Sequence, residues 1–159
     1  MEKYDSDFLL LKFNLQRFLK LCEQAQKQTT TAGLRLKDVQ GTFRGFELKV
    51  SFGSGNLVKR PGLAFLKDGN QVSKGIYPIL VFIPEFNELI LCKGVSYDNP
   101  PEMEWIINEK DIPFSLTKYS DEKGKYNYFI NAYSVNDFNE DMIKDIQLDL
   151  ERIIEDYPI

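Results

Sequence analysis

The stretch VSFGSGNLVKRPGLAFLKDGNQVSKGIYPILVFIPE, residues 50–85, decides the fold of this chain. It begins in an alternating apolar and polar pattern, breaks into a glycine-rich polar loop, and returns through the short apolar run of residues 63–66. A second, strongly apolar run follows at residues 77–83. Strands are therefore predicted at both ends of the loop. Loops held in this way commonly carry binding residues, because the scaffold positions them without burying them.

Strands are also predicted on either side of this stretch. Residues 46–52 alternate apolar and polar side chains, which is the pattern of a half-buried strand. Residues 88–95 form a further strand, and the four residues 84–87 before it have a length suited to a hairpin turn. The middle of the chain is therefore expected to form an antiparallel sheet.

Two amphipathic helices are predicted at the ends of the chain. In residues 5–28 and again in residues 139–157, apolar side chains recur at spacings of three and four. The side chains available as N-caps are Asp5 or Ser6 for the first helix and Asn136 or Asn139 for the second.

The region before the second helix is predicted to contain a helical turn and a strand. The turn is expected at residues 114–119 and the aromatic strand at residues 126–135. This order of elements indicates an α+β fold, with a largely antiparallel β-sheet flanked by an N-terminal and a C-terminal α-helix, in a single domain over residues 1–159. The strand is expected to place Tyr126, Tyr128 and Ile130 on one face and Phe129 and Tyr133 on the other.

Charge is unevenly distributed along the chain. The net charge is −4, but residues 137–159 hold eight acidic and two basic residues, so the acidic excess lies at the C-terminal end. Residues 35–74, by contrast, hold eight basic and three acidic residues. A basic middle and an acidic end are typical of a domain with one anion-binding surface. A solvated surface with randomly clustered charges is the alternative interpretation.

Histidine and several motifs typical of catalytic and metal sites are missing from the sequence. The chain has no histidine, which is the commonest general base and metal ligand. It lacks the GxxxxGK[ST] phosphate loop of GTPases, and Cys22 and Cys92 lack the CxxC spacing of zinc sites. Cys22 falls on the apolar face of the first helix and Cys92 inside a strand, so both are expected to be buried free thiols. We therefore expect a non-catalytic domain without a cofactor or metal.

Several short motifs occur in one order and at one spacing. They are SFGSGN at residues 51–56, Pro61 followed by LAFL at 63–66, GIYP at 75–78, FNELIL at 86–91 and GVS at 94–96. Together they resemble the N-terminal DNA-recognition domains of the McrB family, which belong to McrBC modification-dependent type IV restriction systems. The resemblance covers about residues 45–105 well. It implies a domain that flips a modified cytosine out of duplex DNA into an aromatic pocket, where stacking and hydrogen bonds offset the lost base pairing.

Carried over by position, the resemblance implies roles for particular residues. Tyr77 of the GIYP motif is expected to line the base pocket, with the apolar Val81 on the same strand. Asn56 of the GxGN loop is expected to border the flipped base. Ser54 and Leu57 hold the loop positions expected to enter the DNA. The basic side chains expected to contact phosphates are Lys59 and Arg60 in the loop, with Lys49 and Lys74 nearby.

Two positions depart from the family pattern. The family loop often has an aromatic residue between its two glycines, where this chain has Ser54. The residue after Pro61 is commonly a tryptophan of the pocket, where this chain has Gly62. Either Tyr126 and Tyr128 replace the missing rings, or the target base differs. The loss of a tryptophan-sized wall at Gly62 predicts a wider pocket that accepts a cytosine carrying more than a methyl group.

The resemblance also implies partners. The ligand would be double-stranded DNA with modified bases, and an AAA+ GTPase domain is expected to follow this one and to connect it to an McrC-like nuclease subunit. The N-terminus has acidic residues before a short apolar run and no cleavage-like site, so a signal peptide is not expected. No segment approaches the length of a membrane span. A cytoplasmic location without membrane contact is therefore expected.

Other interpretations stay open from the sequence alone. The chain is alternatively a protein-interaction or assembly module that uses its aromatic strand and amphipathic helices, or a reader of modified RNA. Tyr77 is then an ordinary strand aromatic, and Asn56 a turn residue that stabilises its loop.

Overall fold

The computed structural model describes residues 5–96, 99 and 101–158. These residues form the predicted α+β fold, in which a seven-stranded antiparallel sheet of order β1-β2-β3-β4-β5-β7-β6 is accompanied by an N-terminal and a C-terminal helix. The strands are β1 (Thr42–Phe43), β2 (Phe46–Ser51), β3 (Gly62–Leu66), β4 (Ile76–Ile83), β5 (Glu88–Val95), β6 (Ile112–Pro113) and β7 (Tyr128–Ser134). The helices are α1 (Ser6–Ala25) and α2 (Glu140–Ile154), with 3₁₀ turns η1 (Leu36–Asp38), η2 (Phe114–Leu116) and η3 (Val135–Asp137).

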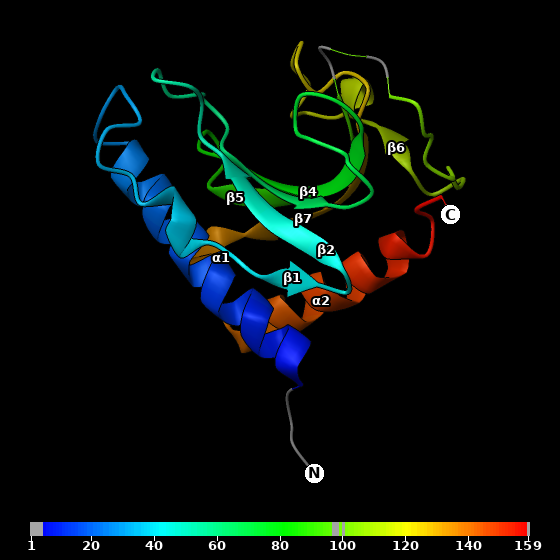
Figure 1. The fold of residues 1–159 in the computed structure, drawn as a ribbon, viewed down its shortest axis with the longest axis horizontal. Coiled ribbons are helices and arrows are strands. Elements are labelled where there is room, and N and C mark those ends of the chain that lie inside the picture. Colours follow the sequence, from blue (N-terminus) through cyan, green and yellow to red (C-terminus); the bar gives the residue numbers. More distant parts are fainter. Residues whose placement is uncertain (1–4, 97–98, 100, 159) are drawn as a thin grey trace.

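Both helices lie against the same face of the sheet, where they form a V (Figure 1). The first N-cap is Asp5, whose carboxylate accepts a hydrogen bond from the Phe8 N–H at 2.8 Å. The second is Asn139, whose Oδ1 accepts from the Met142 N–H at 2.9 Å. Each side chain satisfies a backbone donor that the first helical turn leaves without a partner. Among the described residues, no helix has the length and apolar character of a membrane span.

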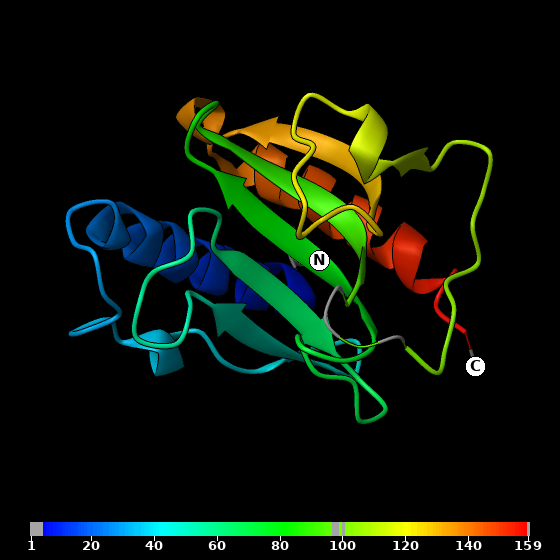
Figure 2. The ribbon, with the colours of Figure 1, turned by 90° about the horizontal axis from the view of Figure 1, so that it is seen from above.

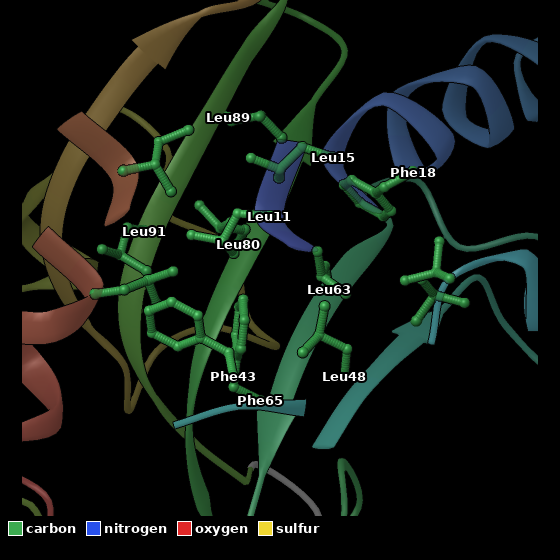
Figure 3. Packing of buried hydrophobic residues seen from close by; sticks show 14 of the residues in the cluster. Leu11, Leu15, Phe18, Phe43, Leu48, Leu63, Phe65, Leu80, Leu89 and Leu91 are labelled. Atoms are coloured by element: carbon green, nitrogen blue, oxygen red, sulfur yellow. The ribbon is translucent and has the colours of Figure 1, made fainter. Parts of the chain in front are cut away.

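The main core fills the space between this face of the sheet and the helices. Each of the side chains labelled in Figure 3 is at most 3% exposed, and burial of each stabilises the fold by roughly 1.5–3 kcal/mol. They are Leu11, Leu15 and Phe18 of α1, with Phe43, Leu48, Leu63, Phe65, Leu80, Leu89 and Leu91 of the strands. Because side chains alternate along a strand, this core determines which residues of β2 to β5 face the other way.

The opposite face of the sheet carries a second, smaller apolar cluster. It contains Tyr77 and Ile79 of β4 and Cys92 of β5, against which Phe114 and Tyr119 pack. The last two belong to the segment of residues 114–127, named here the insert, which crosses above the sheet in Figure 2. The insert covers one part of this face.

The two cysteines lie on opposite sides of the sheet. Cys22 belongs to the main core and Cys92 to the smaller cluster, and both are free and buried. Burial raises the pKa of both thiols, because it disfavours the charged thiolate. The prediction of two buried free thiols is confirmed.

The aromatic strand β7 contains a β-bulge, which changes the predicted alternation of its side chains. The register pairs Leu91 with Asn131 but Cys92 with Phe129, so one extra residue stands between them on β7. The alternation of side chains shifts at that point. Phe129 therefore packs on the smaller cluster and Tyr133 in the main core, and the expectation that they share a face is wrong.

The side chain of Lys93 in β5 connects the sheet to the residues that follow α2. Lys93 is fully buried, and its Nζ donates to Asp111 Oδ2 at 2.6 Å, to Asp156 Oδ2 at 2.8 Å and to the Ile106 carbonyl at 2.7 Å. A buried ammonium needs such partners because its desolvation is costly. The cluster therefore connects β5, the residues around 106–111 and the end of α2.

Candidate nucleic-acid interface

The face of the sheet away from the helices holds most of the residues singled out in the sequence. Directly paired residues of neighbouring strands share a face, and the register pairs Lys49 with Ala64, Gly62 with Val81, and Ala64 with Ile79. Tyr77 lies on the same face, two residues before Ile79. We call this surface the open face; besides these side chains it includes Ser51 and Leu66.

Tyr77 is almost buried in the open face, with 5% of its surface exposed. Its hydroxyl donates a hydrogen bond to the Val72 carbonyl at 2.8 Å. The paired residue on β5 is Gly94, and a Cβ there would lie 3.0 Å from Tyr77 Cε1 and 2.7 Å from the Tyr77 carbonyl. Gly94 therefore provides the space for the Tyr77 ring. The hydroxyl already has a partner within the protein, and only a small part of the side chain reaches the surface.

The space above Gly62 is not empty. A Cβ placed on Gly62 would lie 2.8 Å from Ile79 Cδ1, so the tip of the Ile79 side chain covers this glycine. Val81, directly opposite Gly62, is half-buried. The prediction of vacant space at Gly62 is therefore corrected: any wider pocket here requires Ile79 to change its rotamer.

The glycine-rich loop of residues 52–58 is fixed to the segment that follows α1. The Thr31 N–H donates to the Gly55 carbonyl at 2.8 Å and the Leu57 N–H to the Thr29 carbonyl at 3.2 Å. Gly53, with φ of 107°, brings the Asn56 carbonyl to 2.2 Å from where a Cβ would stand, so only glycine fits there. The loop therefore has a defined shape without a bound ligand.

The side chains of this loop differ in their exposure to solvent. Ser54 and Asn56 are exposed. Leu57 instead packs, half-buried, against the main core. Its apolar side chain anchors the loop to the protein, and the entry of Leu57 into DNA stays a prediction.

The four predicted phosphate ligands fall into two groups. Lys49, Lys59 and Lys74 are exposed, and none of them forms an ion pair with the residues that the structure describes. Arg60 is different, because only 16% of its side chain is exposed and its guanidinium binds Glu85 and Asp121. The three lysines are therefore available to an anion, and Arg60 is already engaged.

Lys74 stands on a hydrogen-bonded turn beside Tyr77. The Gln71 N–H donates to the Lys74 carbonyl at 2.8 Å, and Val72 of the same turn accepts the Tyr77 hydroxyl. The Ser73 carbonyl accepts from Ser96 Oγ at 2.6 Å. This turn forms the border of the open face at the Tyr77 end, where the Lys74 side chain is exposed.

Of the two late tyrosines expected to replace the missing rings, Tyr128 lies on the other side of the sheet. Tyr128 pairs with Lys93, whose ammonium reaches the end of α2, so Tyr128 lies on the helix side and cannot line a pocket with Tyr77. Tyr126 lies before β7 and is 51% exposed, with Lys125 Nζ 5.2 Å from its ring centroid. Phe129 is the β7 aromatic on the open-face side, and the sequence pattern missed it because of the bulge.

Among the described residues, no group of three or more histidine, cysteine or acidic side chains is arranged to hold a metal ion. Cys92 is fully buried, and burial raises the pKa of its thiol, which disfavours the reactive thiolate. The arrangement suits contact with an anionic ligand along exposed lysines and with a flat ring near Tyr77.

Comparison with known proteins gives one match to report. No protein-family model matches the chain. The type IV methyl-directed restriction enzyme EcoKMcrB subunit of Escherichia coli strain K12 is 35% identical over 105 residues, which make up 66% of this chain and 21% of that subunit. The matched region thus spans about a fifth of the length of this relative. The resemblance to the McrB family that the motifs predict is therefore confirmed over two thirds of this chain.

Proposed function

We propose that this domain recognises a modified cytosine in duplex DNA and directs an McrBC-like restriction complex to it. The observation that carries the proposal is the coincidence of the motifs with one surface. The SFGSGN loop, the turn at residues 71–74 and Tyr77 all border the face of the sheet that the two helices leave free. The E. coli subunit that shares 35% identity is a methyl-directed restriction protein by name.

The distribution of charge supports DNA as the ligand. Lys49, Lys59 and Lys74 are exposed around the open face, whereas α2, with five acidic and two basic residues, lies on the opposite side of the sheet (Figure 1). Lysines that neutralise phosphates release condensed counterions, which supplies most of the sequence-independent affinity for DNA. The net charge of −4 is therefore compatible with a DNA-binding surface.

Selectivity would come from one extruded base. We propose that the base stacks on the Tyr77 ring, with Val81 and Ile79 as apolar neighbours and Asn56 at the border. Rotation of Ile79 away from Gly62 would admit a substituent larger than methyl. Ser54, at the exposed end of the loop, would occupy the gap in the duplex without the aromatic ring common in the family.

Further parts of the proposal concern the whole protein. The domain would bind and not cleave, and catalysis would belong to an AAA+ GTPase domain in the same protein and to an McrC-like nuclease subunit. Because the ligand is duplex DNA, we place the protein in the cytoplasm.

Binding to matched duplexes tests the proposal. Fluorescence anisotropy would compare one duplex sequence with unmodified, 5-methyl and 5-hydroxymethyl cytosine, and the same sequence as double-stranded RNA. Tighter binding to one of the modified DNA duplexes is expected. Equal affinity for all three DNA duplexes would contradict a base pocket, preference for the RNA would indicate an RNA reader, and no binding to any nucleic acid would favour a protein-interaction module.

A further inference from the structure

The insert is a loop that closes mainly on itself. The Phe114 N–H donates to the Asn127 carbonyl at 2.9 Å, and the Gly124 N–H donates to Asp121 Oδ1 at 2.7 Å. The Tyr119 N–H donates to Thr117 Oγ1 at 3.2 Å. These local bonds set the shape of the insert, but they do not set its distance from the sheet. Contacts to other segments must do that.

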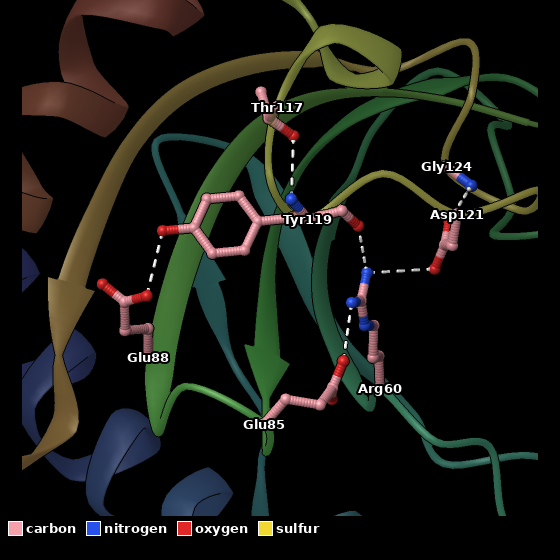
Figure 4. Close-up of polar contacts among 7 residues, drawn as sticks. All are labelled: Arg60, Glu85, Glu88, Thr117, Tyr119, Asp121 and Gly124. Atoms are coloured by element: carbon pink, nitrogen blue, oxygen red, sulfur yellow. Dashed lines mark hydrogen bonds and ion pairs between the residues drawn. The ribbon is translucent and has the colours of Figure 1, made fainter.

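Arg60 provides such contacts by joining three segments of the chain. Figure 4 shows its guanidinium between the insert and the β4–β5 turn. Nη1 donates to the Tyr119 carbonyl and to Asp121 Oδ2, the latter at 3.2 Å, and Nη2 donates to Glu85 Oε2 at 2.7 Å. The hydrogen bond from Arg60 is the main reason that the pKa of Glu85 lies below its usual range. The planar fork of arginine makes this three-way contact possible, and lysine would not reproduce it.

Tyr119 is held both by this contact to its backbone and by contacts of its own side chain, which include an edge-to-face contact with Phe86 at 5.7 Å between ring centroids. Its ring is 5% exposed and stacks on Phe129, with 5.6 Å between ring centroids and an interplanar angle of 23°. Its hydroxyl donates to Glu88 Oε1 at 3.0 Å (Figure 4). Glu88 pairs with Ile83, which lies two residues beyond Val81 on the same face of β4. Tyr119 therefore covers the end of the open face opposite the Tyr77 end.

We infer that Arg60 is a positioning residue of the proposed base site, which holds the insert against the sheet so that Tyr119 closes the site at its Val81 end. The inference rests on the proposed function, because the site that Tyr119 closes is the proposed base site. It assigns Arg60 a role other than the phosphate contact that its place in the loop suggests.

The surroundings of Arg60 argue against direct phosphate binding. Its single positive charge is shared by Glu85 and Asp121, so the three groups together carry a negative charge. A phosphate would have to displace at least one of these charge-assisted hydrogen bonds while lying beside the remaining carboxylate. Lys59, its neighbour in sequence, is exposed and free of ion pairs with described residues, and is the better phosphate ligand.

A measurement without DNA tests the positioning role directly. Burial, followed by the hydrogen bond to Glu88, raises the pKa of Tyr119 to about 12. In Arg60→Gln the insert should move away, and the Tyr119 pKa should fall toward the ordinary value of about 10. Loss of a nearby positive charge would by itself raise a tyrosine pKa, so a fall reports exposure of the ring and not the missing charge. The ¹³C resonance of the Tyr119 ring, assigned with Tyr119→Phe, follows this titration.

Lys59→Gln is the matched control, because it removes the same charge one residue away without a contact to the insert. Its Tyr119 pKa should match that of the wild type. An unchanged Tyr119 pKa in folded Arg60→Gln would overturn the positioning role, whatever the effect of this substitution on DNA binding. If Arg60→Gln does not fold, Arg60→Lys, which keeps the charge but loses the fork, gives the same titration test.

A second measurement uses the full domain with modified and unmodified duplexes over a series of salt concentrations. Arg60→Gln should bring the affinity ratio of the two duplexes toward one and leave the salt slope unchanged. Lys59→Gln should weaken binding to both duplexes alike and reduce the salt slope of binding by about 0.9. A slope reduced by about 0.9 in Arg60→Gln, with the affinity ratio intact, would make Arg60 a phosphate ligand and overturn the inference. A wild-type domain that does not distinguish the duplexes would instead refute the proposed function, while the titration still decides whether Arg60 positions Tyr119.

Discussion

Tyr77 allows a sharp test of the proposed pocket, because its hydroxyl and its ring have separate partners. The hydroxyl binds the Val72 carbonyl, and the ring lies against Gly94. Tyr77→Phe removes only the first contact, and Tyr77→Leu removes the ring while keeping an apolar side chain. Tyr77→Ala is less suitable, because truncating a ring that is only 5% exposed costs about 3–5 kcal/mol, against a total stability of about 5–15 kcal/mol.

The two substitutions should differ strongly in base selectivity. Stacking of one base on an aromatic side chain contributes about 1–3 kcal/mol, so Tyr77→Leu should reduce the preference for modified DNA by about 5- to 160-fold, or down to no preference. Tyr77→Phe should keep the preference. It should lower the free energy of unfolding by about 1 kcal/mol, because the Val72 carbonyl loses its donor.

The assay is competition anisotropy with modified and unmodified duplexes of one sequence, together with thermal unfolding of each variant. Phe82→Leu is the matched control, because Phe82 is 4% exposed on the same strand but packs in the main core. It should destabilise the domain without changing the preference. A folded Tyr77→Leu variant that prefers modified DNA as strongly as the wild type would place the pocket elsewhere. Loss of preference in Tyr77→Phe would show that the hydroxyl reads the base.

Three further predictions follow from the charges, the glycine and the helix cap. Replacing all three exposed lysines of the open face by alanine should reduce the salt slope of DNA binding by about 2.7, whereas Arg152→Ala on α2 should leave it unchanged in the same titrations. Gly62→Trp, whose ring must displace Ile79, should shift preference toward the smaller cytosine substituent at a stability cost of about 1–3 kcal/mol, measured by binding and thermal unfolding; no shift would mean that Gly62 does not line the pocket. Asp5→Ala should lower the free energy of unfolding by about 1 kcal/mol at neutral pH. The Phe8 N–H holds the pKa of Asp5 below its usual value, so this difference should shrink as pH falls through that lowered pKa, and a difference that grows in acid would contradict the capping role.

Local sequence signals predicted most of the fold. The helix of residues 5–28 and the strand of residues 46–52 were recognisable because one side of each packs on a single core, which imposes a clear period on the apolar residues. The strand of residues 88–95 is buried on both faces and reads instead as a nearly continuous apolar run. The hairpin turn at residues 84–87 was recognisable from its length between two strongly apolar runs, and Asn87 adopts the positive φ of 51° that this turn requires.

Features that depend on contacts between distant segments were not predictable in this way. The bulge opposite Leu91 and Cys92 shifts Phe129 onto the open-face side. No residue type in β7 indicates a bulge at this position. The engagement of Arg60 by Glu85 and Asp121 joins segments 25 and 61 residues away, so the loop sequence alone suggested a free cation. Sequence similarity therefore located the loops, but it did not reveal which of their side chains are available to a ligand.

Separation of charge across the sheet explains how an acidic domain can present a surface for DNA. Helix α2, which carries five acidic residues, lies against one face of the sheet (Figure 1), and the register places Lys49 on the other. Packed layers are about 10 Å apart, which exceeds the Debye length of about 8 Å at physiological ionic strength. At that salt concentration the α2 acids act only weakly on a phosphate at the open face. Near 0.01 M salt the Debye length grows to about 30 Å, so the same acids then repel the duplex. The affinity for DNA should therefore stop rising as the salt concentration approaches about 0.01 M. The number of lysine–phosphate contacts should accordingly be taken from the salt slope in the physiological range.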